Sequence, residues 1–151
     1  MQKPNLTKAL LAGVLGTIAM TMLTYIAPMM GMPEMNIPQM LSGFMGVPIV
    51  AGWLAHVMIG TVFAVLYAYI FASRIPGSPV VKGVLYGLIP WFLAQVMVNP
   101  MMGTGVFALN TPTPMLMVIG SLMGHLVYGA VLGEVYGGSA LSKSIPVPQH
   151  N

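Results

Sequence analysis

The chain has 151 residues, of which only 5% are charged and 57% are hydrophobic. An ordinary soluble domain carries about 25% charged residues, most of them on its surface. Five Lys and Arg with two Asp and Glu cannot cover a soluble fold of this size. The composition therefore excludes a soluble enzyme, a nucleic-acid-binding domain and a disordered tail. It predicts a multi-pass membrane protein in contact with the lipid bilayer, without nucleic acid as a partner.

Four segments are long and apolar enough to cross a bilayer as helices, which takes about 20 residues each. We expect these spans at about residues 9–27, 48–72, 80–98 and 115–136. The predicted fold is an all-α membrane protein that forms a single transmembrane domain over residues 1–151. The first span is preceded by Lys3 and Lys8, but no small-x-small cleavage site follows it, so we interpret it as a retained helix.

The segments that join the spans on one side differ in character. Residues 28–47 stay apolar between the first two spans, which favours a short helix that lies at the membrane interface or is tucked back into the membrane. Residues 99–114, between the last two spans, contain more Thr and Asn and are more typical of a loop.

All basic residues fall on the other side of this four-span topology. Lys3 and Lys8 precede the first span, Arg74 and Lys82 flank the loop between the second and third, and Lys143 follows the fourth. Positive residues concentrate in the cytoplasmic loops of membrane proteins. We therefore expect both termini in the cytoplasm, in a bacterial inner membrane.

The first helical hairpin recurs in the second half of the chain, in units of about residues 8–72 and 80–137. The first and third spans both end in Pro-Met-Met-Gly, at Gly31 and Gly103. The second and fourth spans carry a His, a Gly and a Tyr at identical spacing: His56, Gly60 and Tyr67, then His125, Gly129 and Tyr136. This repeat predicts two tandem hairpins related by a pseudo-two-fold axis along the membrane normal.

The two histidines are the strongest candidate site residues. Each lies about 12–15 Å from one end of its span, given a rise of about 1.5 Å per residue, and a titratable group at that depth points to function. Small residues precede and follow each His at helical spacing. The candidate site comprises His56, His125, Gly52, Gly60, Gly129 and Gly133.

This site predicts a b-type haem with the two histidines as its iron ligands. Opposite corners of a four-helix bundle lie roughly 11–14 Å apart, which suits two imidazoles on one iron. The four glycines would leave room for the porphyrin, and a buried site would tune the haem through its ligands. The chain contains no self-contained catalytic motif, so the expected activity is at most electron transfer.

Two other interpretations remain open for the histidines. In one, the small residues only let helices approach, and each His bonds across the interface to the other His, Thr17, Thr21 or Gln95. The protein would then be a cofactor-free structural accessory subunit. In the other, the histidines and Gln95 line the pathway of a small channel or carrier.

Methionine is abundant, with 16 residues in the chain. Methionines cluster on the outer side of the first hairpin and are echoed in the second: Met29, Met30, Met32, Met35, Met40 and Met45, then Met101, Met102, Met115 and Met117. Thioethers suit Cu(I), although methionine also serves as a flexible apolar filler.

The four-span layout, with the run Gly52-Trp53-Leu54-Ala55-His56, resembles small bacterial inner-membrane proteins of unassigned function. The resemblance covers most of the chain and implies no activity. The expected function is therefore a small membrane subunit of a respiratory or electron-transfer complex, with haem b at His56 and His125. With almost no extramembrane domain, it would work with other membrane subunits or as a homo-oligomer.

Overall fold

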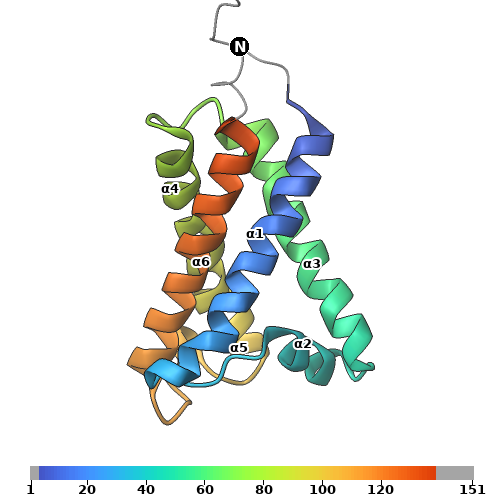
Figure 1. Ribbon diagram of the computed structural model, residues 1–151. Helices are drawn as coiled ribbons and strands as arrows, with labels where there is room; N and C mark the ends of the chain where they lie inside the picture. The colour runs from blue at the N-terminus through green and yellow to red at the C-terminus, as the bar shows by residue number, and fades with distance from the viewer. Residues whose placement is uncertain (1–3, 139–151) are drawn as a thin grey trace, which may run out of the picture.

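The computed structural model describes residues 4–138, which form a helical bundle (Figure 1). Four helical segments are long and apolar enough to cross a membrane: Leu6–Met30, Ile49–Phe71, Pro79–Met101 and Pro114–Gly137. They confirm the four predicted spans, with limits that differ by a few residues. The protein is thus an all-α, multi-pass membrane protein whose spans contact the bilayer. The predicted topology markers Lys3 and Lys143 lie outside the described residues.

Shorter helical pieces continue or connect these spans. The elements in chain order are α1 (Leu6–Ile26), the 3₁₀ turn η1 (Ala27–Met30), α2 (Ile37–Met45), α3 (Ile49–Leu66), the π turn η2 (Tyr67–Phe71), α4 (Pro79–Leu93), the π turn η3 (Ala94–Val98), α5 (Asn99–Met101), the 3₁₀ turn η4 (Val106–Ala108) and α6 (Pro114–Gly137). The short helix expected within residues 28–47 is present as α2.

Side-chain caps mark where three of these helices begin. The first N–H groups of a helix have no partner within it, and a side-chain oxygen just before the helix can accept from them. Asn5 accepts from the Lys8 N–H at the start of α1, Asn36 caps α2 in the same way, and Ser78 caps α4. These polar residues fix the helix starts within an otherwise apolar sequence.

The two Pro-Met-Met-Gly segments end their helices in the same backbone conformation. Gly31 has a φ of 83° and Gly103 a φ of 80°, in the left-handed region that glycine adopts without strain and that commonly ends helices. The repeated sequence therefore produces a repeated helix end.

Glycines bring the helices of each hairpin into direct backbone contact. A Cβ atom added at Gly13 of α1 would lie 2.8 Å from the Thr61 Cα of α3. In the second hairpin, a Cβ at Gly83 of α4 would overlap the Gly129 carbonyl oxygen of α6. Small residues at such positions are what lets membrane helices pack closely.

The two hairpins meet along α1 and α6, which pack against each other near the middle of the bundle (Figure 1). Gly16 makes this possible, because a Cβ there would lie 2.9 Å from the Tyr128 ring. On the other side of α1, the start of α3 diverges from α1, and α2 packs against this part of α3 (Figure 1).

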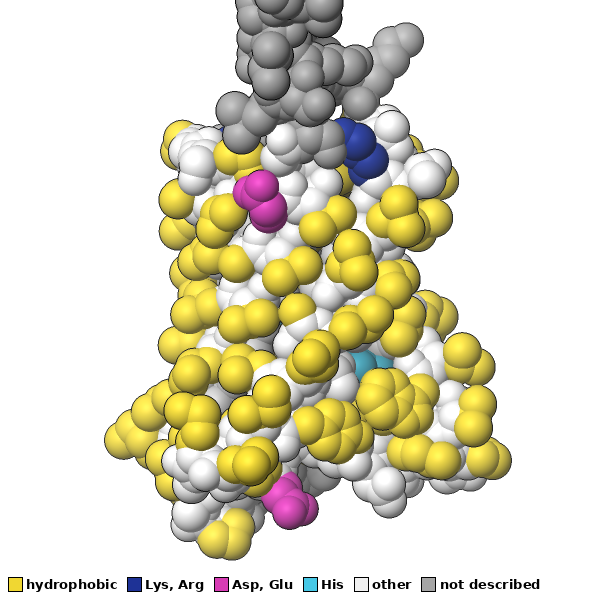
Figure 2. Space-filling model, viewed as in Figure 1, with side chains coloured by type: hydrophobic (Ala, Val, Ile, Leu, Met, Phe, Trp, Pro, Cys, Tyr) yellow, Lys and Arg dark blue, Asp and Glu magenta, His cyan; other side chains and the backbone are white. Residues whose placement is uncertain are grey.

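The described charges lie near the ends of the bundle. Lys8 lies in the first turn of α1, and Arg74 and Lys82 lie around the α3–α4 connection at the same end of the bundle, which we call the basic end. The opposite end, formed by α2, α5 and the loops around them, is the α2 end. Figure 2 shows hydrophobic side chains covering the face between charged groups at the two ends, as a lipid-facing surface requires.

Three tyrosines fill the half of the bundle nearer the basic end. Tyr67 and Tyr86 are each 1% exposed, Tyr128 is 3% exposed, and the rings of Tyr67 and Tyr86 are 5.1 Å apart. The Tyr86 hydroxyl donates to the Phe63 carbonyl across 2.7 Å, and the Tyr128 hydroxyl to the Gly60 carbonyl across 2.5 Å. These three residues, the tyrosine layer, tie α4 and α6 to α3 and close this half of the bundle.

Candidate functional site

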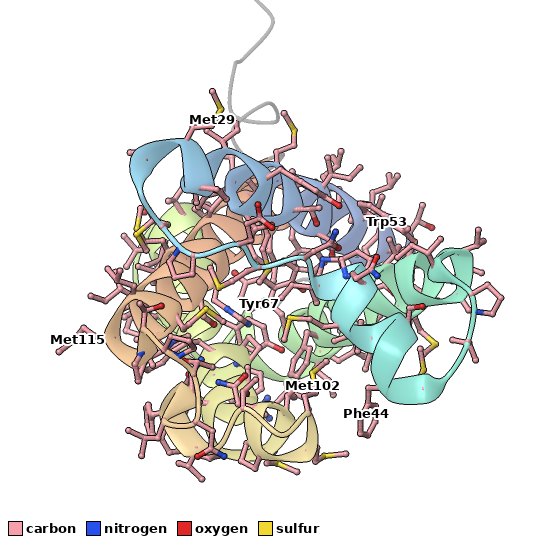
Figure 3. All side chains as sticks on the ribbon, turned by 90° about the horizontal axis from the view of Figure 1, so that it is seen from below. Met29, Phe44, Trp53, Tyr67, Met102 and Met115 are labelled. Carbon is pink, nitrogen blue, oxygen red and sulfur yellow. The ribbon has the colours of Figure 1, made fainter. Side chains whose placement is uncertain are left out.

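A cavity of about 170 Å³ lies in the half of the bundle nearer the α2 end. Residues of α1, α2, α3, α4 with η3, and α6 line it, and both His56 and His125 are among them. Tyr128 of the tyrosine layer lines the cavity, and so does Phe63, whose carbonyl accepts from Tyr86. Figure 3 looks at the molecule from the α2 end, where Met102 of the cavity wall lies between α2 and α5. Both histidines thus line one cavity, which we call the histidine cavity.

His56 is 6% exposed and bonds across the α1–α3 interface. Its Nε2 atom lies 3.0 Å from Thr21 Oγ1, and that hydroxyl also lies 2.7 Å from the Thr17 carbonyl, to which it donates. A hydroxyl has one proton, so the hydrogen-bond network assigns the proton of the His56 contact to Nε2. A neutral His56 therefore keeps a lone pair on Nδ1.

His125 bonds within its own helix. Its Nδ1 atom lies 2.7 Å from the Ser121 carbonyl oxygen, which can only accept, so Nδ1 carries the proton and Nε2 keeps the lone pair. Within residues 4–138, the structure gives no hydrogen-bond partner to this Nε2 or to His56 Nδ1. The histidine cavity thus has two imidazole lone pairs available to a ligand.

A chain of amides holds the helix segment that carries His125. Gln95, 1% exposed in η3, donates from Nε2 to Ser121 Oγ across 3.1 Å and accepts from Asn99 Nδ2 across 3.0 Å. Pro90 lies one turn before η3, and a proline removes a helical hydrogen bond and clashes with the preceding turn. The π turn after it places Gln95 toward α6 instead of toward lipid.

The first pair of predicted site glycines faces neighbouring elements. A Cβ at Gly52 would overlap the Pro38 carbonyl oxygen of α2, and a Cβ at Gly60 would overlap Thr17 Oγ1 of α1. Of the four predicted glycines, only Gly60 lines the histidine cavity. The space that these residues leave open is filled by α1 and α2.

The second pair packs against α4. A Cβ at Gly129 would overlap the Gly83 carbonyl oxygen, and a Cβ at Gly133 would overlap the Pro79 carbonyl oxygen. The room expected for a porphyrin beside these glycines is therefore occupied by helix backbone.

The arrangement of these residues does not fit a haem. Pockets for small organic ligands usually measure about 300–1,000 Å³, and the histidine cavity measures about 170 Å³. His56 also uses its Nε2 atom in the Thr21 contact.

Sequence reasoning missed most of the remaining cavity wall. Five methionines line it, each from a different part of the fold: Met20, Met35, Met40, Met102 and Met117. Their abundance was visible in the sequence, but which of them converge was not. Within the described residues, no three or more His, Cys, Asp or Glu side chains lie together.

The comparisons with known proteins place the chain in a family without assigning an activity. Residues 4–146 match the model of the family described as "Family of unknown function (DUF6789)". No curated protein and no solved structure matches the chain. Because the family match spans nearly the whole sequence, the chain belongs to the DUF6789 family.

Proposed function

We propose that the protein is a small membrane carrier that binds a small cation or hydrogen-bond donor in the histidine cavity. The observation that carries this proposal is the pair of lone pairs, on His56 Nδ1 and His125 Nε2, at one cavity inside the membrane-spanning bundle. A ligand that fits between two acceptors must supply either a proton or a positive charge.

The position of the cavity supports a carrier that exchanges its ligand from one side at a time. The cavity occupies the half nearer the α2 end, and the tyrosine layer closes the half nearer the basic end. In carriers with internal repeats, one repeat moves against the other around a site near the bilayer middle. Such a movement would open the tyrosine layer at the Tyr86–Phe63 and Tyr128–Gly60 hydrogen bonds.

The sequence repeat supplies the two bodies for that movement. We infer that the two hairpins arose by duplication and are related by a pseudo-two-fold axis along the membrane normal. The matching contacts of Gly13 with α3 and Gly83 with α6, and the shared φ of Gly31 and Gly103, support this relationship.

We also propose that the basic end faces the cytoplasm of a bacterial cell, with both termini on that side. The described cations Lys8, Arg74 and Lys82 support this orientation, because cytoplasmic loops are enriched in Lys and Arg. The α2 end would then face outward, and the histidine cavity would exchange its ligand with that side.

The geometry favours a carrier over the expected electron-transfer subunit, because the cavity is too small for a haem and both imidazoles keep a lone pair free. Assembly with other membrane subunits, or as a homo-oligomer, stays a prediction. The cofactor-free accessory subunit requires packing alone, and packing alone does not explain why both histidines line a cavity.

Single cysteines can test the proposal, because the chain contains none of its own. Ser121→Cys places a thiol at the cavity wall, and Leu132→Cys places one on the same helix at a position that is 0% exposed, beside the tyrosine layer. A carrier predicts that a membrane-impermeant maleimide labels Ser121→Cys from the outer side and leaves Leu132→Cys unlabelled.

The second arm weakens the tyrosine layer. In a Tyr86→Phe/Tyr128→Phe background, which removes both hydroxyl hydrogen bonds to α3, Ser121→Cys should also be labelled from the cytoplasmic side. If Ser121→Cys is labelled only from the outer side in both backgrounds, the cavity is a binding site open to one side, and the proposal of a carrier is overturned. If Ser121→Cys is labelled from neither side, the cavity is not accessible and the proposed binding site is overturned as well.

A further inference from the structure

We propose that the ligand of the histidine cavity is a soft monovalent metal ion, and that Cu(I) is the ion that fits it. This inference rests on the proposed function and names its ligand class. The candidate donors are His56 Nδ1, His125 Nε2 and the thioether sulfurs of the methionines that line the same cavity.

The thioethers reach the cavity from separate elements. Met20 comes from α1, Met35 from the segment before α2, Met40 from α2, Met102 from the turn after α5, and Met117 from α6. A convergence from so many elements is a property of the folded bundle, since no short sequence motif brings these residues together.

Two of these methionines pack on the small residues of α6 that precede His125. A Cβ at Gly120 of α6 would lie 2.5 Å from the Met35 Cε and 3.7 Å from its sulfur, and a Cβ at Gly124 would lie 3.3 Å from the Met20 Cγ. These glycines thus make room for two methionine side chains on the helix that carries His125, and Met20, Met35 and His125 all line the same cavity.

The donor set selects the kind of ion. Thioether sulfur is a soft ligand that prefers Cu(I), and imidazole also binds copper. Ca²⁺ and Mg²⁺ require oxygen ligands, mainly carboxylates, and no Asp or Glu lines the histidine cavity. Structural zinc sites use four ligands from Cys, His and carboxylates, whereas two His are present here.

The surroundings favour a single positive charge. All of the proposed donors are uncharged, so the ion's own charge would remain uncompensated inside the membrane, where charges are costly. The electrostatic cost of burying an ion rises with the square of its charge, so a monovalent ion is far less costly there than a divalent one. Cu(I) combines this charge with the preference for sulfur and imidazole.

The cavity is large enough for an ion and small beside the pockets of about 300–1,000 Å³ that hold organic ligands. A water molecule takes about 30 Å³ of liquid volume, so the cavity of about 170 Å³ has room for about five or six water-sized groups. That space suffices for an ion, with or without bound waters.

The test is Cu(I) binding by the purified full chain in lipid nanodiscs. Cu(I) is kept reduced with ascorbate under anaerobic conditions, and its affinity is measured by competition with the coloured chelator bicinchoninate. We expect one Cu(I) per chain and an X-ray absorption spectrum with both sulfur and nitrogen neighbours around copper.

Two variant pairs separate the cavity from the surface. Met20→Leu/Met35→Leu keeps the side-chain volumes, a change that packed cores tolerate, and should weaken Cu(I) binding by more than about tenfold while removing copper–sulfur scattering. The matched control is Met29→Leu/Met115→Leu, at positions that are 87% and 74% exposed, and it should bind like the unaltered protein. His125→Asn removes the proposed nitrogen donor and should also weaken Cu(I) binding. Its affinity is compared with that of the unaltered protein only if both elute at the same volume in size-exclusion chromatography.

The outcomes distinguish this inference from the proposed function. If Cu(I) does not bind stoichiometrically, or if only the surface pair weakens it, the metal assignment is overturned. Outer-side labelling of Ser121→Cys would then still support an accessible cavity for another ligand. If that cysteine is unreactive as well, both proposals fail.

Discussion

His56 and Thr21 form a hydrogen bond of 3.0 Å that joins α3 to α1 in the interior of the bundle. Thr21 Oγ1 is the acceptor, because its own proton is used by the Thr17 carbonyl. The bond therefore does two things: it connects two spans of the first hairpin, and it fixes which nitrogen of His56 remains available to a ligand.

Replacing Thr21 by Val keeps the shape of the side chain and removes the acceptor of this bond. The buried His56 Nε2–H is then left without a partner, and we expect a loss of about 1–2 kcal/mol in the free energy of unfolding. Reversible unfolding in mixed micelles of increasing SDS content measures it. Thr61→Val is the control, since the Thr61 hydroxyl bonds only to carbonyls of its own helix. Equal stability of the two variants would contradict the role of the bond.

Gly83→Ala should separate α4 from α6. The added Cβ would overlap the Gly129 carbonyl oxygen, which is backbone and cannot move without shifting the helix, so we expect a loss of about 1–3 kcal/mol, as for other overpacked cores. Gly43→Ala in α2 is the matched control, because nothing lies within 4 Å of its added Cβ, and it should be neutral or slightly stabilising. The same SDS unfolding experiment compares them, and a Gly83→Ala variant as stable as Gly43→Ala would refute the close packing.

The purified protein should show no haem spectrum. The glycines around both histidines face other helices, and the cavity of about 170 Å³ is small for a porphyrin. We expect no reduced-minus-oxidised Soret or α band in protein prepared from haem-replete cells. A Soret band that disappears in both His56→Ala and His125→Ala would instead establish the bis-histidine haem that the sequence predicts.

The α3–α4 connection and the loop before α6 should lie on opposite sides of the membrane. Ser73 and Thr113 are both exposed and lie at opposite ends of the bundle, so Ser73→Cys and Thr113→Cys report on the two sides. We expect an impermeant maleimide added to intact spheroplasts to label only Thr113→Cys, and Ser73→Cys to react after the cells are opened. Labelling of Ser73→Cys in intact spheroplasts would reverse the proposed orientation.

The spans could be predicted from the sequence because length, apolar composition and the positions of charges act locally along the chain. Part of the site could also be predicted: Thr21 was one of the expected partners of a buried His, and it bonds His56. His125 instead bonds the Ser121 carbonyl of its own helix. The spacing of four residues allows this bond, but the repeat suggested that His125 would bond across a helix interface as His56 does.

Which elements pack against the predicted site glycines could not be predicted from the sequence. The sequence places Gly52, Gly60, Gly129 and Gly133 on the faces that carry the histidines, but the rotation of each helix decides what fills those faces. That rotation depends on contacts between residues far apart in the sequence, such as Gly16 with Tyr128. The cavity and its methionines follow from the same long-range packing.

The contact between α1 and α6 has a consequence for how the chain is assembled. α1 leaves the ribosome before α6, and Gly16 packs on Tyr128 only when both helices are in the bilayer. Until then, the face of α1 that α6 covers is open to the lipid tails or to other proteins. α6 therefore completes the burial of α1, and a nascent chain that stops before α6 leaves that face of α1 uncovered.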